Sequence, residues 1–145
     1  MRPSSGATTP FEYAVNPDGS LRWRFRKDSE TYGSPAIHNG NAVFGDHRGR
    51  VLTIDMTTGR TVATALGEQK PSRSRSVGVW TSPAIDRDGN LYLGTRLGHI
   101  YGFTANGERL LDIDTHDTVD SYPALTTDGT LLIGSSNGIL YAIRD

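Results

Sequence analysis

The chain has 145 residues and a mass of 15.7 kDa, with a formal net charge of -1 and no cysteine. That length suffices for one ordinary hydrophobic core, and the near-neutral charge provides no field that would favour nucleic acid or an anionic membrane surface. The absence of cysteine excludes disulfide bonds and thiolate metal sites. No apolar stretch is long enough to span a bilayer, and residues 1–10 lack the apolar region of a signal peptide.

The first predicted elements belong to an incomplete blade of β-strands. Residues 1–10 are expected to form a disordered tail, and residues 11–27 are expected to form half a blade, its third and fourth strands. Within 21–26, Trp23 and Phe25 alternate with three arginines. This period of two predicts one face packed on a neighbouring blade and one charged face in water, where the arginines discourage edge-to-edge pairing.

Three later segments are near copies of one another. They begin at Ser34-Pro35-Ala36-Ile37, Ser82-Pro83-Ala84-Ile85 and Tyr122-Pro123-Ala124-Leu125, and each then carries apolar runs around two glycines. Asp-Gly and Asn-Gly pairs between the runs predict tight hairpin turns, because glycine enters positive φ without a steric clash. Each segment is therefore predicted to be an antiparallel meander, forming a blade over 34–66, a blade over 82–114 and an incomplete blade over 121–145.

Repeats of about 40 to 50 residues made of short strands and glycine turns are typical of a β-propeller. The predicted fold class is all-β, a partial propeller of about three four-stranded antiparallel blades. Closed propellers have about 4 to 8 blades, so we expect that this chain does not close alone. Two alternatives stay open: the chain is part of a larger propeller, or several copies assemble through their open blade edges.

The repeat also resembles that of a known superfamily. The repeat contains Ser-Pro-Ala-Ile, Asp-Gly-Asn-Leu-Tyr-Leu-Gly-Thr and Gly-His-Ile-Tyr-Gly-Phe, followed by Asn-Gly-Glu. This pattern resembles the repeat of PQQ-like β-propellers, and the resemblance covers about residues 11–145. That superfamily includes quinoprotein alcohol dehydrogenases, an outer-membrane assembly lipoprotein and sensor domains of bacterial kinases. The resemblance implies the propeller fold and favours an extracytoplasmic location. The quinoproteins hold their cofactor against a cysteine pair and a calcium ion, and this chain lacks the cysteines and any matching calcium or catalytic-Asp motif, so no cofactor is expected.

No catalytic or metal-binding constellation stands out in the sequence. The four histidines lack ligand spacing, and the turn 86–90 is too short for a calcium loop. Ser34, Ser82 and Ser121 recur beside proline and are expected to be structural hydroxyl groups at strand starts. Arg73 and Arg75 form a small basic loop that a solvated linker explains, so no nucleic-acid partner is expected.

One end of the propeller is predicted to carry the candidate binding residues. Loops that lead from one blade to the next share a face with the loops between second and third strands, and long loops on a rigid face commonly carry function. This face is expected to collect Tyr32, His47, Arg48, Trp80, Arg96 and Tyr122. One hypothesis is that Trp80, Arg48 and Arg96 form a recognition patch for a polar or anionic partner; the alternative is that Trp80 packs between adjacent blades.

The sequence therefore predicts a non-catalytic propeller module that binds a protein or a small polar ligand, as part of a larger scaffold or sensor protein. The alternative is a fragment of a quinone (PQQ)-dependent dehydrogenase. No residue is predicted to be catalytic, cofactor-binding or metal-binding.

Overall fold

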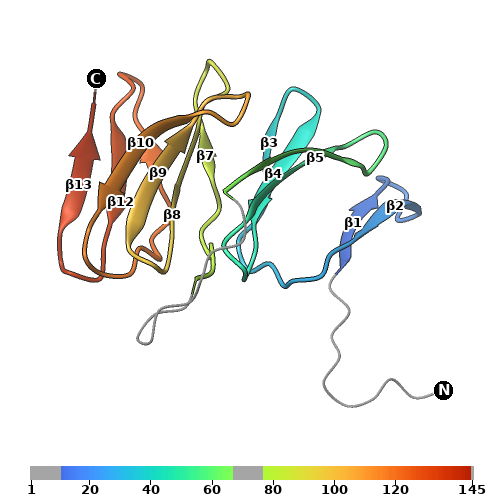
Figure 1. Cartoon of the computed structure of the whole chain (residues 1–145). Coiled ribbons are helices and arrows are strands. Elements are labelled where there is room, and N and C mark those ends of the chain that lie inside the picture. The colour runs from blue at the N-terminus through green and yellow to red at the C-terminus, as the bar shows by residue number, and fades with distance from the viewer. Residues whose placement is uncertain (1–10, 67–76, 145) are drawn as a thin grey trace, which may run out of the picture.

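The computed structural model describes residues 11–66 and 77–144, and every regular element in these two ranges is a β-strand (Figure 1). The predicted tail 1–10 and the basic loop with Arg73 and Arg75 lie outside the described residues. Within the described ranges no segment forms a helix that could cross a membrane.

The strands form four separate antiparallel sheets, which we name half-blade 1 and blades 2, 3 and 4. Half-blade 1 contains β1 (Phe11–Val15) and β2 (Leu21–Arg26). Blade 2 contains β3 (Ala36–His38), β4 (Asn41–Gly45), β5 (Val51–Asp55) and β6 (Thr61–Ala65). Blade 3 contains β7 (Ala84–Ile85), β8 (Leu91–Gly94), β9 (His99–Phe103) and β10 (Arg109–Asp114). Blade 4 contains β11 (Ala124–Leu125), β12 (Leu131–Gly134) and β13 (Leu140–Ile143).

Each sheet is a meander, in which strands adjacent in sequence are hydrogen-bonded neighbours. The first strands of successive blades contact one another, because β7 touches both β3 and β11. This arrangement places the first strands on the inner side, and the sheets follow one another across the molecule from half-blade 1 to blade 4 (Figure 1). The predicted fold class is confirmed: the described chain is an all-β, partial β-propeller without closure.

The turn chemistry follows the sequence pattern. Gly89, Gly107 and Gly129 adopt φ values of 84°, 85° and 86°, in the left-handed region that glycine reaches without a steric clash. The first strand of blades 2, 3 and 4 begins at the alanine after the proline rather than at the proline itself, since proline has no N–H to give to the ladder.

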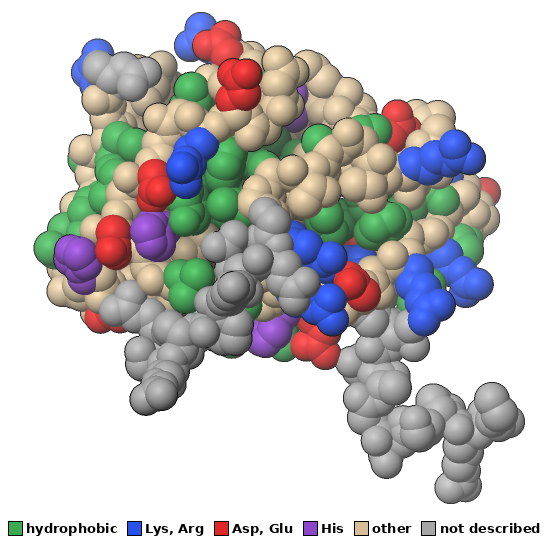
Figure 2. All heavy atoms as spheres, in the orientation of Figure 1, with side chains coloured by type: hydrophobic (Ala, Val, Ile, Leu, Met, Phe, Trp, Pro, Cys, Tyr) green, Lys and Arg blue, Asp and Glu red, His purple; other side chains and the backbone are tan. Residues whose placement is uncertain are grey.

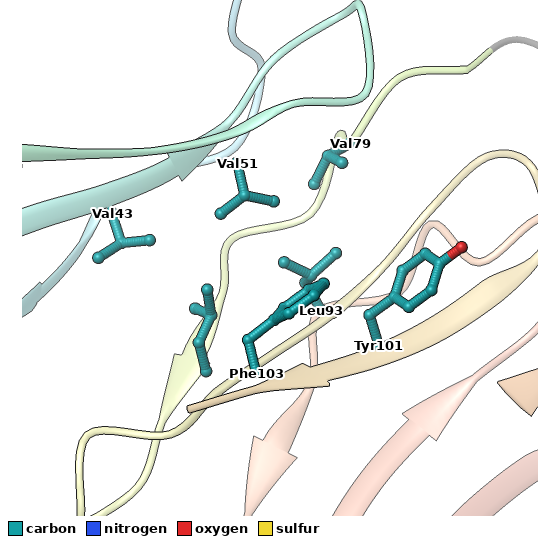
Figure 3. Packing of buried hydrophobic residues seen from close by; sticks show 7 residues of the cluster. Val43, Val51, Val79, Leu93, Tyr101 and Phe103 are labelled. Atoms are coloured by element: carbon teal, nitrogen blue, oxygen red, sulfur yellow. The ribbon is translucent and has the colours of Figure 1, made fainter. Parts of the chain in front are cut away.

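The hydrophobic core lies between the blades. Val43 and Val51 of blade 2 meet Leu93, Tyr101 and Phe103 of blade 3, and Val79 enters from the connecting loop (Figure 3). A second cluster joins blades 3 and 4, and a third joins blade 2 to Trp23 and Phe25 of half-blade 1. The middle strands of blades 2 and 3 are therefore buried on both faces, which explains their uninterrupted apolar runs.

Glycines at the ends of β4 and β8 make this close packing possible. A Cβ atom added to Gly45 or Gly94 would lie 2.2 Å from Cγ1 of Val79 or Val119, respectively, so no larger residue fits there. The hydroxyl group of Ser121 donates to the carbonyl of Gly134 at 2.8 Å, and Thr81 bonds Gly94 in the same way at 3.2 Å. The recurrent structural hydroxyl groups are thus those of Thr81 and Ser121. Ser82 instead accepts the backbone N–H of Ser34 at 2.8 Å.

Candidate binding face

Two classes of loop meet at one end of the propeller, as the backbone hydrogen bonds show. The N–H of His47, in the turn between β4 and β5, donates to the carbonyl of Glu30 at 2.8 Å. The N–H of Arg96, between β8 and β9, donates to Gly78 at 3.0 Å, and blade 4 repeats the pattern. We call this end the loop face. Its described parts are 27–35, 46–50, 77–83, 95–98, 115–123 and 135–139.

Three aromatic rings from three loops converge on the loop face. The ring centroids of Tyr32 and Trp80 are 4.9 Å apart, and His47 lies 5.9 Å from each of them. Such separations are typical of favourable aromatic pairs. Together with Arg96 these rings make up what we call the aromatic cluster.

Arg96 completes the cluster by covering the indole ring. Its Cζ atom lies 3.9 Å from the Trp80 ring centroid, within the range of a cation–π contact. The same guanidinium pairs with Asp120, with Nη1 and Oδ2 3.0 Å apart. On another side Trp80 lies against Gly78, where an added Cβ atom would be 2.4 Å from Nε1. Glycine at position 78 is therefore required for the indole to lie in this place.

The cluster has an exposed layer and a half-buried layer. Tyr32 and His47 are exposed, whereas Trp80 and Arg96 are half-buried. The Tyr32 hydroxyl donates to Glu30 at 2.8 Å, and this hydrogen bond raises the pKa of Tyr32 above its ordinary value. Among the described residues, Nε1 of Trp80 and Nε of Arg96 are buried without a hydrogen-bond partner. The cluster thus combines exposed rings with donors that its own neighbours leave unused.

A buried carboxylate holds the turn that carries His47. Asp46 is fully buried and accepts the N–H groups of Arg48 and Arg50 at 3.0 and 2.9 Å. Nε of Arg50 donates to the same carboxylate at 2.8 Å, so the buried charge is paired as well as hydrogen-bonded. The backbone carbonyl of Asp46 accepts the N–H of Val79 at 2.9 Å, and this hydrogen bond connects the turn to the loop that carries Trp80.

The structure brings together four of the six predicted face residues, Tyr32, His47, Trp80 and Arg96. Arg48 points to Asp28 instead, with Nη1 2.9 Å from Oδ2. Tyr122 is exposed on the loop that leads into blade 4, one blade further along. The two hypotheses for Trp80 are not exclusive, because the indole packs between loops of neighbouring blades and is nevertheless partly open to solvent.

Sequence reasoning missed three residues of this site: Glu30, Gly78 and Asp120. Glu30 and Gly78 each act on a residue two positions further along the same loop, Tyr32 and Trp80, whereas Asp120 pairs with Arg96 of another loop. The repeat gives no signal for Gly78, since Glu30 and Thr118 stand at the positions that accept the equivalent backbone hydrogen bond beside blades 2 and 4. Within the described ranges, no group of three His, Asp or Glu side chains lies close enough together to hold a metal ion.

Comparison with known proteins reveals similarity of fold. No protein-family model matches the chain, and no curated protein sequence matches it. Among solved structures, BamB from Moraxella catarrhalis matches 92% of this chain with a TM-score of 0.70 and 18% identity. The WD40 β-propeller domain of Doa1 matches 86% with a TM-score of 0.68 and 14% identity. Quinohemoprotein alcohol dehydrogenase ADHIIG from Pseudomonas putida HK5 also matches 86%, with a TM-score of 0.65 and 18% identity.

The chain spans only part of each of these proteins: 39% of BamB, 40% of the Doa1 domain chain and 28% of the dehydrogenase. At such identities the likeness concerns the fold alone. BamB and the dehydrogenase are PQQ-like propellers, so the resemblance seen in the repeat is confirmed at the level of the fold. The chain is a partial β-propeller.

Proposed function

We propose that this chain is a non-catalytic binding module of a larger scaffold or sensor protein, and that its aromatic cluster contacts the partner. The observation that carries the proposal is the convergence of Tyr32 and His47 on Trp80, whose indole ring the guanidinium of Arg96 covers. Tyr, Trp and Arg are the residues that most often dominate binding energy at protein interfaces. The partner is a protein segment or a small polar ligand, and its acidic or aromatic groups would meet the cation and the exposed rings.

The test is a screen of an immobilised peptide library with the labelled chain. For peptides that the wild type retains, Tyr32→Ala should abolish binding or weaken the affinity about 30-fold. This loss corresponds to about 2 kcal/mol, as for a hot-spot residue. Val62→Ala, which shortens an exposed side chain on β6 away from the loop face, is the matched control. Retention of the same peptides by Tyr32→Ala and Trp80→Phe at unchanged affinity would refute the proposal.

A fragment of a quinone-dependent dehydrogenase is the competing proposal, and the residues present do not fit the cofactor. The chain has no cysteine for the vicinal pair. Its described residues offer no metal-binding group, and the Trp80 ring is covered by Arg96. We therefore derive no chemical step through a quinone. Titration with PQQ and Ca²⁺ should leave the absorption spectrum of the cofactor unchanged, and a saturable shift would revive this alternative.

We also infer an extracytoplasmic location from the likeness to PQQ-like propellers. Fractionation of cells that express the natural protein tests it: recovery in the periplasmic or secreted fraction is the expected result, and recovery in the cytoplasm would contradict it.

A further inference from the structure

A cavity lies between blades 2 and 3 at the end of the propeller opposite the loop face. Its volume is about 130 Å³, and it is bordered by three turns: the two-residue turn between β3 and β4, the turn between β7 and β8, and the turn between β9 and β10. Blades 2 and 3 both have four strands, so complete sheets form its walls. A cavity of roughly 150 Å³ is enough for benzene, so this one has room for one small molecule.

The strand register places polar side chains of blade 2 on the face that meets blade 3. His38 pairs with Asn41 across β3 and β4, and Val43 pairs with Thr53 across β4 and β5. Residues directly opposite each other share a face of the sheet, as do residues two apart along a strand. Because Val43 packs in the core against blade 3, the other three side chains face blade 3 as well. All three are half-buried and line the cavity.

These polar groups are unused by the protein itself. The imidazole of His38, the amide groups of Asn39 and Asn41 and the hydroxyl group of Thr53 form no hydrogen bond or ion pair with residues 11–66 or 77–144. A few polar groups that converge on a mostly apolar cavity are typical of a small-molecule site. Nε2 of His38 lies close to Gly89, where an added Cβ atom would be 2.9 Å away, so the imidazole reaches across to blade 3.

Blade 3 uses its polar groups differently at the equivalent place toward blade 4. The counterparts of His38, Asn41 and Val43 are Asp86, Asn90 and Tyr92. Asp86 accepts the side-chain amide of Asn90 at 2.9 Å and the hydroxyl group of Tyr92 at 3.2 Å. The polar groups of blade 3 thus satisfy one another, whereas those of blade 2 are left open to the cavity.

The lining indicates an uncharged ligand. None of the described residues that line the cavity is Asp, Glu, Lys or Arg, and enclosing an unpaired charge is strongly unfavourable. In Figure 2 the region over the β3–β4 hairpin, at the top of the molecule in Figure 1, is mostly tan, the colour of backbone and uncharged polar side chains. Amide and hydroxyl groups and a neutral imidazole both donate and accept hydrogen bonds. The remaining walls are mainly aliphatic, formed by Val43, Ala63, Ala65, Ile85, Leu91 and Ala105.

We propose that this cavity binds a small uncharged polyhydroxy molecule, such as the edge of a pyranose sugar. Its hydroxyl groups contact His38, Asn41 and Thr53, and its C–H groups lie against Ala63 and the other aliphatic walls. The site goes beyond the proposed function, because it lies at the other end of the blades from the aromatic cluster.

The probe is methyl β-D-xylopyranoside, titrated against the full chain and followed by saturation-transfer difference NMR. Saturable binding is expected. Thr53→Val removes a hydroxyl group and keeps the side-chain shape, so it should weaken binding about fivefold, the effect of one lost hydrogen bond. Thr64→Val is the matched control, because Thr64 pairs with Leu52 on the face of blade 2 that meets half-blade 1. Absence of saturable binding, or an equal loss in both variants, would overturn the proposal.

Ala63→Leu tests the site without removing a polar group. The larger side chain would enter the cavity, so binding should be lost while the circular dichroism spectrum stays that of the wild type. Val62→Leu adds one methylene group at the neighbouring residue, which is 55% exposed and absent from the lining, and it should bind the pyranoside as the wild type does. Unchanged affinity in Ala63→Leu would contradict the assignment of the ligand to this cavity.

Sodium acetate separates an uncharged ligand from a small anion. Among the described residues that line the cavity, His38 is the one titratable side chain. Acetate is expected not to compete with the pyranoside. Acetate that displaces it, and binds more tightly at pH 5.5 than at pH 7.5, would overturn the proposal in favour of an anion beside protonated His38. Tyr32→Ala should leave pyranoside binding unchanged, so failure here and failure of the proposed function are distinguishable.

Discussion

Arg50 pairs with two carboxylates, Asp28 and Asp46, whose surroundings differ. Asp46 is fully buried and depends on Arg50 for its ion pair. Asp28 is exposed, and Arg50 and Arg48 both pair with it. The hydrogen bond from Arg50 lowers the pKa of Asp28 below its ordinary value. This network steadies the turn that presents His47, so stability and the geometry of the loop face are linked through a few residues.

Asp28→Asn therefore has a predictable pH dependence. A carboxyl group with a lowered folded-state pKa stabilises the fold above its unfolded pKa of about 3.9, and this stabilisation is lost as the pH falls through the folded pKa. The difference in unfolding free energy between wild type and Asp28→Asn should be constant from about pH 5 to 7 and shrink below about pH 4. Because Asp28 is exposed, we expect a difference below about 1 kcal/mol. Urea unfolding at several pH values measures it, and a difference that grows toward low pH would contradict the assignment.

At the scale of elements, blade packing depends on the glycine at the end of each second strand. Gly94 is pressed by Val119 from the following loop, which also donates its N–H to Thr95 at 3.0 Å. Gly134 holds the same place in blade 4, but the nearest atom to an added Cβ is the Ser121 hydroxyl oxygen at 3.4 Å. The same residue type is thus under close steric constraint in blade 3 and under little constraint in blade 4.

Gly94→Ala and Gly134→Ala form a matched pair. Gly94→Ala should lower the free energy of unfolding by about 1–3 kcal/mol, because the methyl group would overlap Val119. Gly134→Ala should change it by less than about 0.5 kcal/mol. Adding Val119→Ala to Gly94→Ala should relieve the overlap, so the double variant should lose less than the sum of the two single losses. Chemical denaturation measures the wild type, the three single variants and the double variant; equal losses at the two glycines would show that the valine contact is not the cause.

At the scale of the whole molecule, the two ends of the blade array expose surfaces that are interior elsewhere. Leu140 of β13 is 69% exposed, whereas Ile100, at the equivalent place of β9, is fully buried by the next blade. Apolar surface of this kind marks interaction sites or causes aggregation. The sequence leaves two alternatives open, a larger propeller or an assembly of several copies, and this exposed face is a surface on which the second can be tested.

Leu140→Lys should reduce self-association without unfolding the chain. Wild-type protein is expected to show a mean mass above 15.7 kDa that rises with concentration, and the variant should stay nearer that value. Light scattering over a concentration series measures the mass, with Val62→Lys as the control for an added charge at another exposed apolar position. A wild-type chain that is monomeric throughout the series would refute the prediction.

The fold was predictable because its determinants are local and repeated. Glycine at positions such as 89 and 129 enforces the turns, and short loops leave only antiparallel neighbours. Alternation around Trp23 and Phe25 indicated which face of β2 meets a neighbouring blade, and these side chains pack against blade 2. The candidate face was predictable only in part, since loop order places residues at one end of a propeller but does not determine which of them touch.

The sequence by itself determined the all-β class, the blade repeat and the end of the molecule that gathers aromatic and cationic side chains, because strand period and turn glycines act within a few residues of one another. Only the tertiary structure decided that Arg96 covers Trp80 while Arg48 pairs with Asp28, and that His38 and Thr53 line a cavity between blades 2 and 3. These features join residues from different blades. They follow from how one sheet packs on the next, which no local pattern encodes.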